Sequence, residues 1–149
     1  MDDSASAEDD FALTVDDSAS AVLVIDDEPS IVRLLRVLLE ADGFVVFEAM
    51  TGPMGLGLIP VVEPKAVVLD VMMPGMDGVE VCSHITEEFP DLPVVILTGR
   101  DDRELEERCM AAGAKRFMTK PVLPGQLTRV LNDVLAPDGD RSRGPAAVD

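Results

Sequence analysis

Five short apolar runs recur along this chain, separated by segments with helix or turn signals. The runs lie near residues 21–26, 44–49, 65–70, 94–98 and 115–119. Strands that alternate with helices are joined by right-handed crossovers, so they align in parallel with helices on both faces of the sheet. We therefore expect an α/β fold whose five parallel strands form a doubly wound sheet.

Helix signals follow most of these runs. A first helix is expected to begin near Pro29 and to end near Gly43, since proline suits the first turn of a helix and glycine its end. Three later helices are expected near residues 77–88, 103–113 and 124–135. The first helix should turn a core-facing stripe inward, because apolar residues recur there at helical spacing. The stripe consists of Ile31, Leu34, Leu35, Leu38 and Leu39.

The segment from 51 to 63 opposes this pattern. It should form the second helix of the fold, yet glycine or proline occupies Gly52, Pro53, Gly55, Gly57 and Pro60. Relative to alanine, glycine costs about 1 kcal/mol and proline about 3 kcal/mol inside a helix. We therefore expect a second helix that is short or frayed.

The composition fits one compact domain. The chain has 149 residues, of which 47% are hydrophobic, and its formal net charge is -17. Binding to nucleic acid needs clustered Lys and Arg, so this charge argues against nucleic acid as a direct partner. Residues 1–20 hold seven acidic and no basic side chains and lack the apolar core of a signal peptide or anchor. We therefore expect no membrane insertion and a cytoplasmic protein.

We expect three regions along the chain. Residues 1–19, rich in Asp, Ser and Ala, are interpreted as an acidic disordered N-terminal extension. The folded domain is expected to span residues 20–136, and residues 137–149 are interpreted as a disordered C-terminal tail. The residues after Leu135 are too few and too polar to form an effector domain, so the output is expected to come through protein contact.

The two cysteines and the single histidine are expected to be structural. Cys82 and Cys109 lie in apparent helices and form no CxxC pair, which favours buried reduced thiols over a disulfide or a zinc site. His84 lies in a predicted helix with no cluster of metal ligands nearby in sequence. We interpret it as a surface or packing residue and not as a phosphate carrier.

Polar side chains stand at the ends of four of the five apolar runs. Asp26 and Asp27 follow the first run, Asp70 follows the third, Thr98 ends the fourth and Lys120 follows the fifth. The carboxyl ends of parallel strands meet at one edge of a sheet, where such folds bind ligands. A few carboxylate oxygens that leave room for water and a phosphoryl group favour Mg2+. For Asp26 and Asp27 alone, however, an acidic turn that caps the next helix is the favoured interpretation.

Together these side chains indicate a phosphoryl-transfer site. The Asp70 carboxylate suits a nucleophile that forms an acyl phosphate. Thr98 suits a hydrogen-bond donor, and Lys120 suits a partner for the phosphoryl oxygens while Mg2+ neutralises the remaining charge. Each position also has an ordinary structural interpretation, but their combination at four strand ends favours the site.

A family resemblance rests on five segments with matching order and spacing. They read Val-Leu-Val-Ile-Asp26-Asp27-Glu28-Pro29, Val-Val-Leu-Asp70-Val-Met-Met-Pro74-Gly75-Met-Asp77-Gly78, Val-Val-Ile-Leu-Thr98-Gly99, Gly113-Ala114-Lys115-Arg116-Phe117 and Lys120-Pro121. Across about residues 20–136 the chain resembles the response-regulator receiver domain of bacterial two-component signalling, in its single-domain, chemotaxis-regulator-like form. The resemblance implies a flavodoxin-like (βα)5 fold with strand order 2-1-3-4-5.

The resemblance also implies roles for the site residues. Asp70 would accept a phosphoryl group from a sensor histidine kinase or a phosphotransfer protein. Mg2+ would be held by Asp27, Asp70 and the backbone carbonyl of Met72, with Asp26 acting through water. Lys120 would contact the phosphoryl group, and its bond to the following proline would be cis.

By the same resemblance, Thr98 and Phe117 would form the switch that reports phosphorylation. The alternative interpretation of Phe117 is an ordinary core ring. A downstream effector protein would bind the face formed by the fourth helix, the fifth strand and the fifth helix. Enzyme activity would amount at most to self-catalysed phosphotransfer and slow autodephosphorylation.

Two positions depart from the commonest pattern of the family. Met72 lies two residues after Asp70, and Arg100 lies two residues after Thr98. The family places groups at these positions near the water that attacks the phosphoryl group. We hypothesise that an apolar and a cationic side chain there hinder that water and lengthen the phosphorylated lifetime.

The function expected from these observations is that of a stand-alone response regulator in a phosphorelay. The alternative is a degenerate receiver that acts as a non-phosphorylated scaffold, or as a phosphate sink. An aspartate-nucleophile phosphatase would carry a second acid where this chain has Met72. A flavin carrier would have aromatic side chains and a Ser/Thr-rich phosphate loop, whereas the loop after the first strand is acidic and only 3% of residues are aromatic.

Overall fold

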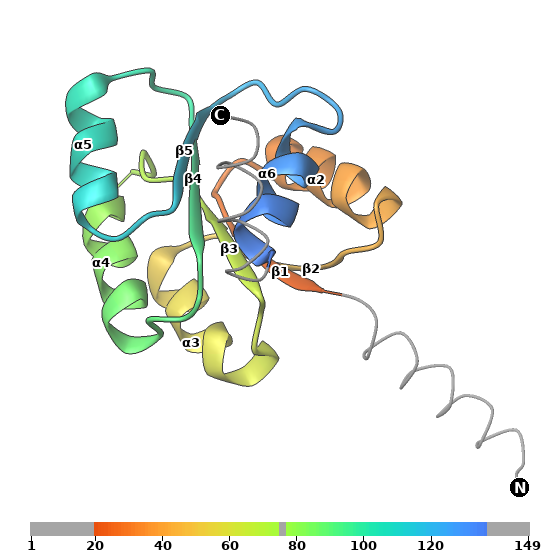
Figure 1. Ribbon diagram of the computed structural model, residues 1–149, viewed down its shortest axis with the longest axis horizontal. Coiled ribbons are helices and arrows are strands. Elements are labelled where there is room, and N and C mark those ends of the chain that lie inside the picture. The colour runs from red at the N-terminus through yellow and green to blue at the C-terminus, as the bar shows by residue number, and fades with distance from the viewer. Residues whose placement is uncertain (1–19, 75–76, 137–149) are drawn as a thin grey trace, which may run out of the picture.

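The computed structural model describes residues 20–74 and 77–136. Figure 1 shows a central sheet with helices on both of its faces. The sheet has the order β2-β1-β3-β4-β5 and each neighbouring pair is parallel, which confirms the predicted fold class and strand order. Its strands are β1 (Ala21–Ile25), β2 (Val45–Ala49), β3 (Ala66–Leu69), β4 (Val94–Thr98) and β5 (Arg116–Thr119).

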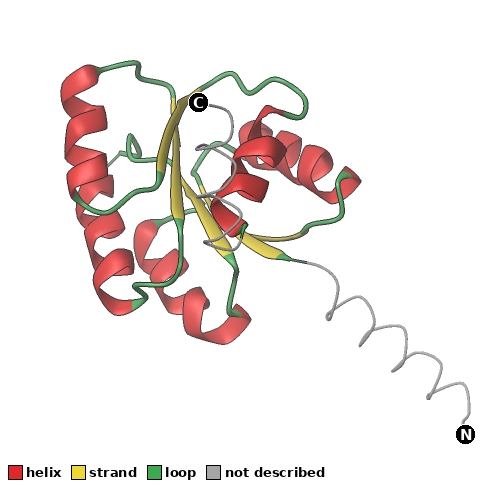
Figure 2. Cartoon of the chain, in the orientation of Figure 1, coloured by secondary structure: helices red, strands yellow, loops and turns green. Residues whose placement is uncertain are grey.

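The helices form two outer layers. Helices α3, α4 and α5 cover one face, while α2 and α6 cover the other (Figures 1 and 2). A hydrophobic cluster lies on each side of the sheet, one containing Leu23 and Ile25 of β1 and the other Val22 and Val24 of the same strand. Because side chains alternate along a strand and both faces are covered, β1 and β3 are apolar throughout and β4 is apolar up to Thr98. The helices are α2 (Pro29–Ala41), α3 (Gly52–Val62), α4 (Gly78–Glu88), α5 (Arg103–Ala111) and α6 (Gln126–Leu135).

The prediction of a short or frayed second helix is wrong. Helix α3 runs for 11 residues, and the Thr51 hydroxyl caps it by accepting the N–H of Met54 at 3.1 Å. The glycines that lower its helix propensity also let it approach the sheet: Gly55 is buried, and a Cβ added there would lie 2.8 Å from Cγ1 of Ile25. Close packing on β1 therefore offsets an unfavourable local sequence.

The predicted core stripe of the first helix is partly wrong. Leu35 and Leu39 are buried as expected, but Leu34 is 43% exposed, and Val32 is buried in addition. Helix α2 is thus rotated so that positions 32, 35 and 39 face the sheet. Spacings of three and four residues fit more than one such stripe, so periodicity alone left the choice open.

The structure confirms buried free thiols and a surface position for the histidine, while its expected lack of a phosphate-carrying role stays a prediction. Cys82 in α4 and Cys109 in α5 are free, buried thiols. Burial disfavours the thiolate, and it raises the pKa of Cys82 to about 12 and that of Cys109 to about 11. His84 is exposed on α4.

Several predictions fall outside the described residues: the extension over residues 1–19, the tail over residues 137–149, and Gly75 with Met76 of the motif after Asp70. The division of the chain into three regions therefore stays a prediction. No helix within residues 20–74 and 77–136 is long and apolar enough to span a bilayer.

Two glycines of α3 provide a matched test of its packing on the sheet. Gly57 is exposed and a Cβ added there meets nothing within 4 Å, so Gly57→Ala should raise the free energy of unfolding by about 0.5–1 kcal/mol. Gly55→Ala has the same propensity gain but overpacks against Ile25, so it should be less stable than Gly57→Ala by about 1–3 kcal/mol. Urea unfolding of both variants measures this difference, and equal stabilities would contradict the close approach.

Candidate functional site

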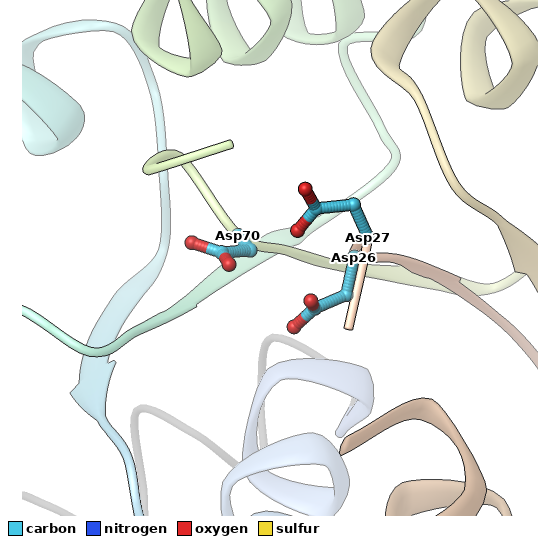
Figure 3. A group of neighbouring side chains, drawn as sticks. All are labelled: Asp26, Asp27 and Asp70. Atoms are coloured by element: carbon cyan, nitrogen blue, oxygen red, sulfur yellow. The ribbon is translucent and has the colours of Figure 1, made fainter. Parts of the chain in front are cut away.

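Three carboxylates gather at the edge of the sheet where the strands end. One carboxylate oxygen from each of Asp26, Asp27 and Asp70 lies within 4.8 Å of the other two. The register causes this, because Ile25 pairs with Leu69 and the N–H of Asp70 donates to the Ile25 carbonyl at 3.0 Å. Figure 3 shows the carboxylates of Asp26 and Asp27 directed toward the side on which Asp70 lies. The acids predicted to meet at this edge do lie together there.

Asp26 is buried and held from two sides. Its Oδ1 accepts the N–H of Glu28 at 2.9 Å, and its Oδ2 lies 3.0 Å from Nζ of Lys120. Burial raises the pKa of Asp26, because the loss of hydration outweighs the hydrogen bonds from Glu28 and Lys120 that lower it. The capping interpretation does not hold, since the N-cap of α2 is Glu28 and its side chain makes no cap hydrogen bond.

The Lys120 ammonium lies among three carboxylates. Its Nζ is 2.6 Å from Oε1 of Glu28, 3.0 Å from Oδ2 of Asp26 and 3.1 Å from Oδ2 of Asp70, and its side chain is only 12% exposed. Burial by itself lowers the pKa of Lys120, but the hydrogen bonds to Glu28, Asp26 and Asp70 together raise it above its usual value. The cation therefore stays protonated and offsets the repulsion between these acids.

Thr98 brings a hydroxyl to the same edge. It pairs with Thr119 at the end of β4, and its carbonyl accepts the N–H of Lys120 at 2.8 Å. Thr98 is fully buried, and within the described part of the chain its Oγ1 is the buried side-chain polar atom without a hydrogen-bond partner. A buried polar atom left unpaired costs about 1–3 kcal/mol. This hydroxyl is therefore available to a polar group that arrives at the site.

The backbone of Met72 contacts the site, whereas its side chain is partly exposed to solvent. Its N–H donates to Oδ1 of Asp70 at 2.9 Å, which fixes the carboxylate together with Lys120. The side chain is 44% exposed. The role predicted for the Met72 carbonyl as a metal ligand stays a prediction.

The other two predicted residues lie on β5 and on the loop that leads to α5. Phe117 pairs with Ile96 across β4 and β5 and packs, partly buried, against the cluster under α3, α4 and α5. Arg100 is exposed, and its Nη2 lies 2.9 Å from Oδ2 of Asp102, the N-cap of α5. The guanidinium of Arg100 is thus held by Asp102 at the start of that helix.

The donor set fits Mg2+. Asp26 and Asp70 are buried, Asp27 is partly buried, and all three offer hard oxygen ligands at one point. Magnesium prefers such oxygens and keeps several waters, which leaves positions for a phosphoryl group. Like charges this close repel one another in a partly buried site, so a divalent cation would relieve a cost that Lys120 only partly offsets.

Sequence reasoning missed the contribution of Glu28. Glu28 is part of the first motif but was assigned no role there, yet it makes the shortest contact of the Lys120 ammonium. Residues 28 and 120 are 92 positions apart, so no local pattern links them. The available signal was that glutamate immediately precedes Pro29, in a position where Ser, Thr, Asp or Asn usually caps the helix.

The arrangement is suited to phosphoryl chemistry. Asp70 presents a fixed carboxylate, Lys120 supplies a positive charge 3.1 Å from it, and Thr98 supplies an uncommitted hydroxyl. Phosphoryl transfer needs little covalent assistance beyond the nucleophile, and depends mainly on positioning and on neutralising negative charge. The acids, the cation and the hydroxyl meet these needs.

Comparisons with known proteins agree with this geometry. A family model described as "Response regulator receiver domain" matches residues 22–132. The alkaline phosphatase synthesis transcriptional regulatory protein PhoP of Bacillus subtilis is 36% identical over 114 residues, which are 76% of this chain and 48% of PhoP. The response regulator MprA of Mycolicibacterium vanbaalenii is 41% identical over 100 residues, which are 67% of this chain and 43% of MprA.

A solved structure shares the fold over nearly its whole length. The CheY-like receiver domain protein of Methanospirillum hungatei superposes with a TM-score of 0.76 at 25% identity, covering 85% of this chain and 99% of that one. The chain spans less than half the length of the two curated relatives above. What is shared is therefore the receiver part of those regulators. The chain belongs to the family of response regulator receiver domains of two-component systems.

Proposed function

We propose that this receiver accepts a phosphoryl group on Asp70 in a Mg2+-dependent reaction and signals through phosphorylation-dependent protein contact. The observation that carries the proposal is the buried Thr98 hydroxyl, which has no hydrogen-bond partner among the described residues although Thr98 is bound to the Lys120 backbone. A phosphoryl oxygen on Asp70 would supply that partner. The donor is a phosphohistidine of a sensor histidine kinase or a phosphotransfer protein, as for receiver domains in general.

In the transfer step an oxygen of Asp70 attacks phosphorus, an O–P bond forms, and the N–P bond of the donor phosphohistidine breaks. The bonding electrons return to the donor imidazole, which takes up a proton. When bound, Mg2+ supplies positive charge for the phosphoryl oxygens. Lys120 supplies a further charge, and the Met72 N–H together with Lys120 holds Asp70 in position.

The response to phosphorylation is proposed to run through Thr98 and Phe117 to the face formed by α5, β5 and α6. Thr98 ends β4 beside β5, where Phe117 lies two residues before Thr119, the partner of Thr98 in the sheet. Phosphorylation replaces the single charge of the Asp70 carboxylate by the roughly two charges of an acyl phosphate and adds acceptor oxygens, which draw the Thr98 hydroxyl toward the site. An effector protein then binds the altered face, and slow autodephosphorylation returns the receiver to its unphosphorylated state. The expectation that the regulator is stand-alone stays a prediction.

Phosphorylation of Asp70 can be tested directly. With acetyl phosphate and Mg2+, the wild-type protein should gain one phosphoryl group in intact-mass measurements. Asp70→Asn removes the nucleophile and should abolish the gain, while Asp77→Asn, which alters the N-cap of α4, should retain it. A wild-type protein that stays unmodified would instead favour the non-phosphorylated scaffold.

Mg2+ should stabilise the fold through the three acids. At 100 times the dissociation constant, a ligand of the folded state adds about 2.7 kcal/mol to the free energy of unfolding. Asp27→Asn should remove most of this gain. Asp91 is an exposed acid before β4, so Asp91→Asn should leave the gain unchanged. Urea unfolding with and without Mg2+ measures the gain, and an equal loss in both variants would point to general charge screening.

The lifetime hypothesis makes a prediction for Met72. Replacing its half-exposed side chain by a polar one should let the attacking water approach, so Met72→Asn should shorten the half-life of phospho-Asp70 several-fold. Met110 has a similar exposure of 42% but lies on α5, so Met110→Asn serves as the control. The decay of phosphorylated protein after removal of acetyl phosphate gives the rates, and equal decay in wild type and Met72→Asn would refute the hypothesis.

A further inference from the structure

Glu28 makes the shortest contact at the site, although nothing in the phosphoryl chemistry requires it. Its Oε1 lies 2.6 Å from Nζ of Lys120, against 3.0 Å for Asp26 and 3.1 Å for Asp70. The Glu28 side chain is 55% exposed, whereas those of Asp26 and Asp70 are 3% and 6% exposed. Of the three acids on Lys120, Glu28 alone borders open solvent.

The start of α2 explains why Glu28 reaches the lysine. Glu28 is the N-cap residue with an extended backbone, and its side chain caps no N–H of the helix. Its own N–H is bound to Oδ1 of Asp26 at 2.9 Å. The residue is therefore anchored through its backbone to one buried acid of the site, while its carboxylate is directed to the cation of the site.

Three carboxylates surround the Lys120 ammonium, and Glu28 and Asp70 accept hydrogen bonds from it. An ammonium group has three N–H donors, and three carboxylates lie within 3.1 Å of Nζ. A phosphoryl group on Asp70 draws on the same ammonium, so the neighbouring carboxylates compete with it for Lys120. Asp26 is buried and already anchored, and Asp70 is the reacting group. Glu28 is the partner that can turn into water at least cost.

We propose that Glu28 is a positioning residue that holds Lys120 in the unphosphorylated protein and competes with the phosphoryl group for it. This inference rests on the proposed phosphorylation of Asp70. The contact with Glu28 keeps the lysine oriented in the resting state, and its loss is part of the cost of forming the phosphorylated state. Glu28 therefore lowers the affinity of the site for a phosphoryl group.

Beryllofluoride, which mimics a phosphoryl group on aspartate, can test this competition. Fluorine NMR titrations at saturating Mg2+ give its affinity for each variant. Glu28→Gln replaces the ion pair with Lys120 by a weaker hydrogen bond from the ammonium to an uncharged amide oxygen, so it should bind beryllofluoride several-fold more tightly than wild type. Glu28→Asp keeps the charge but shortens the side chain, so it should also bind more tightly. Glu40→Gln removes a charge from α2 that pairs with Arg36 and should bind as wild type does.

A spectroscopic reading separates positioning from a purely structural role. The nitrogen resonance of the Lys120 ammonium should shift in unbound Glu28→Gln relative to wild type, and the two proteins should converge once beryllofluoride is bound. Urea unfolding of each variant shows whether its fold is intact.

Three results would overturn the inference. Equal or weaker binding by Glu28→Gln would exclude competition, and wild-type affinity in Glu28→Asp with tight binding in Glu28→Gln would assign the effect to charge alone. An equal effect of Glu40→Gln would do the same. Failure of the wild-type protein to bind beryllofluoride would instead refute the proposed function, so the two failures are distinguishable.

Discussion

The site depends on one interaction, the contact of the Lys120 ammonium with the carboxylates of Asp26, Asp70 and Glu28. Parallel pairing of β1 with β3 places two buried acids at neighbouring strand ends, where their charges repel in a medium of low dielectric. Lys120 reaches them from the end of β5, two strands away from β3 in the sheet. Breaking a buried ion pair leaves an uncompensated charge and is costly, so the cation and the acids require one another.

The sheet carries this arrangement through its backbone hydrogen bonds. The N–H of Asp70 is bound to the carbonyl of Ile25, and the N–H of Lys120 to that of Thr98. These backbone bonds fix Asp70 relative to β1 and Lys120 relative to β4, so the two side chains keep their places at the edge of the sheet. The helices contribute less directly: Glu28 stands at the start of α2 and Asp102 at the start of α5. Asp102 also caps its helix, whereas the Glu28 side chain makes no cap bond and can release its contact without uncapping α2.

Much of the fold was predictable because the determining patterns are local. Apolar runs alternating with helices specify a parallel sheet, and polar residues after those runs specify which edge carries chemistry. The second helix was expected, but the full length of α3 was not predictable, because glycine lowers helix propensity locally while the benefit, close packing of Gly55 on Ile25, is tertiary. The exposure of Leu34 depends on a rotation of α2 that periodicity does not define. The Glu28 contact joins residues far apart in sequence, so only the folded structure reveals it.

The unpartnered hydroxyl of Thr98 gives the switch an energetic basis. In the unphosphorylated protein that buried group carries a cost of about 1–3 kcal/mol. A phosphoryl group on Asp70 would remove the cost by accepting its hydrogen bond, so phosphorylation favours whatever arrangement of β4 and β5 lets the hydroxyl reach it. A bias of this size changes a two-state ratio by about 5- to 150-fold. The contact between Glu28 and Lys120 must break in the same transition, and its loss opposes phosphorylation. The resting state of the receiver would therefore depend on two free energies: the cost of the unpaired Thr98 hydroxyl and the stability of the Glu28–Lys120 contact.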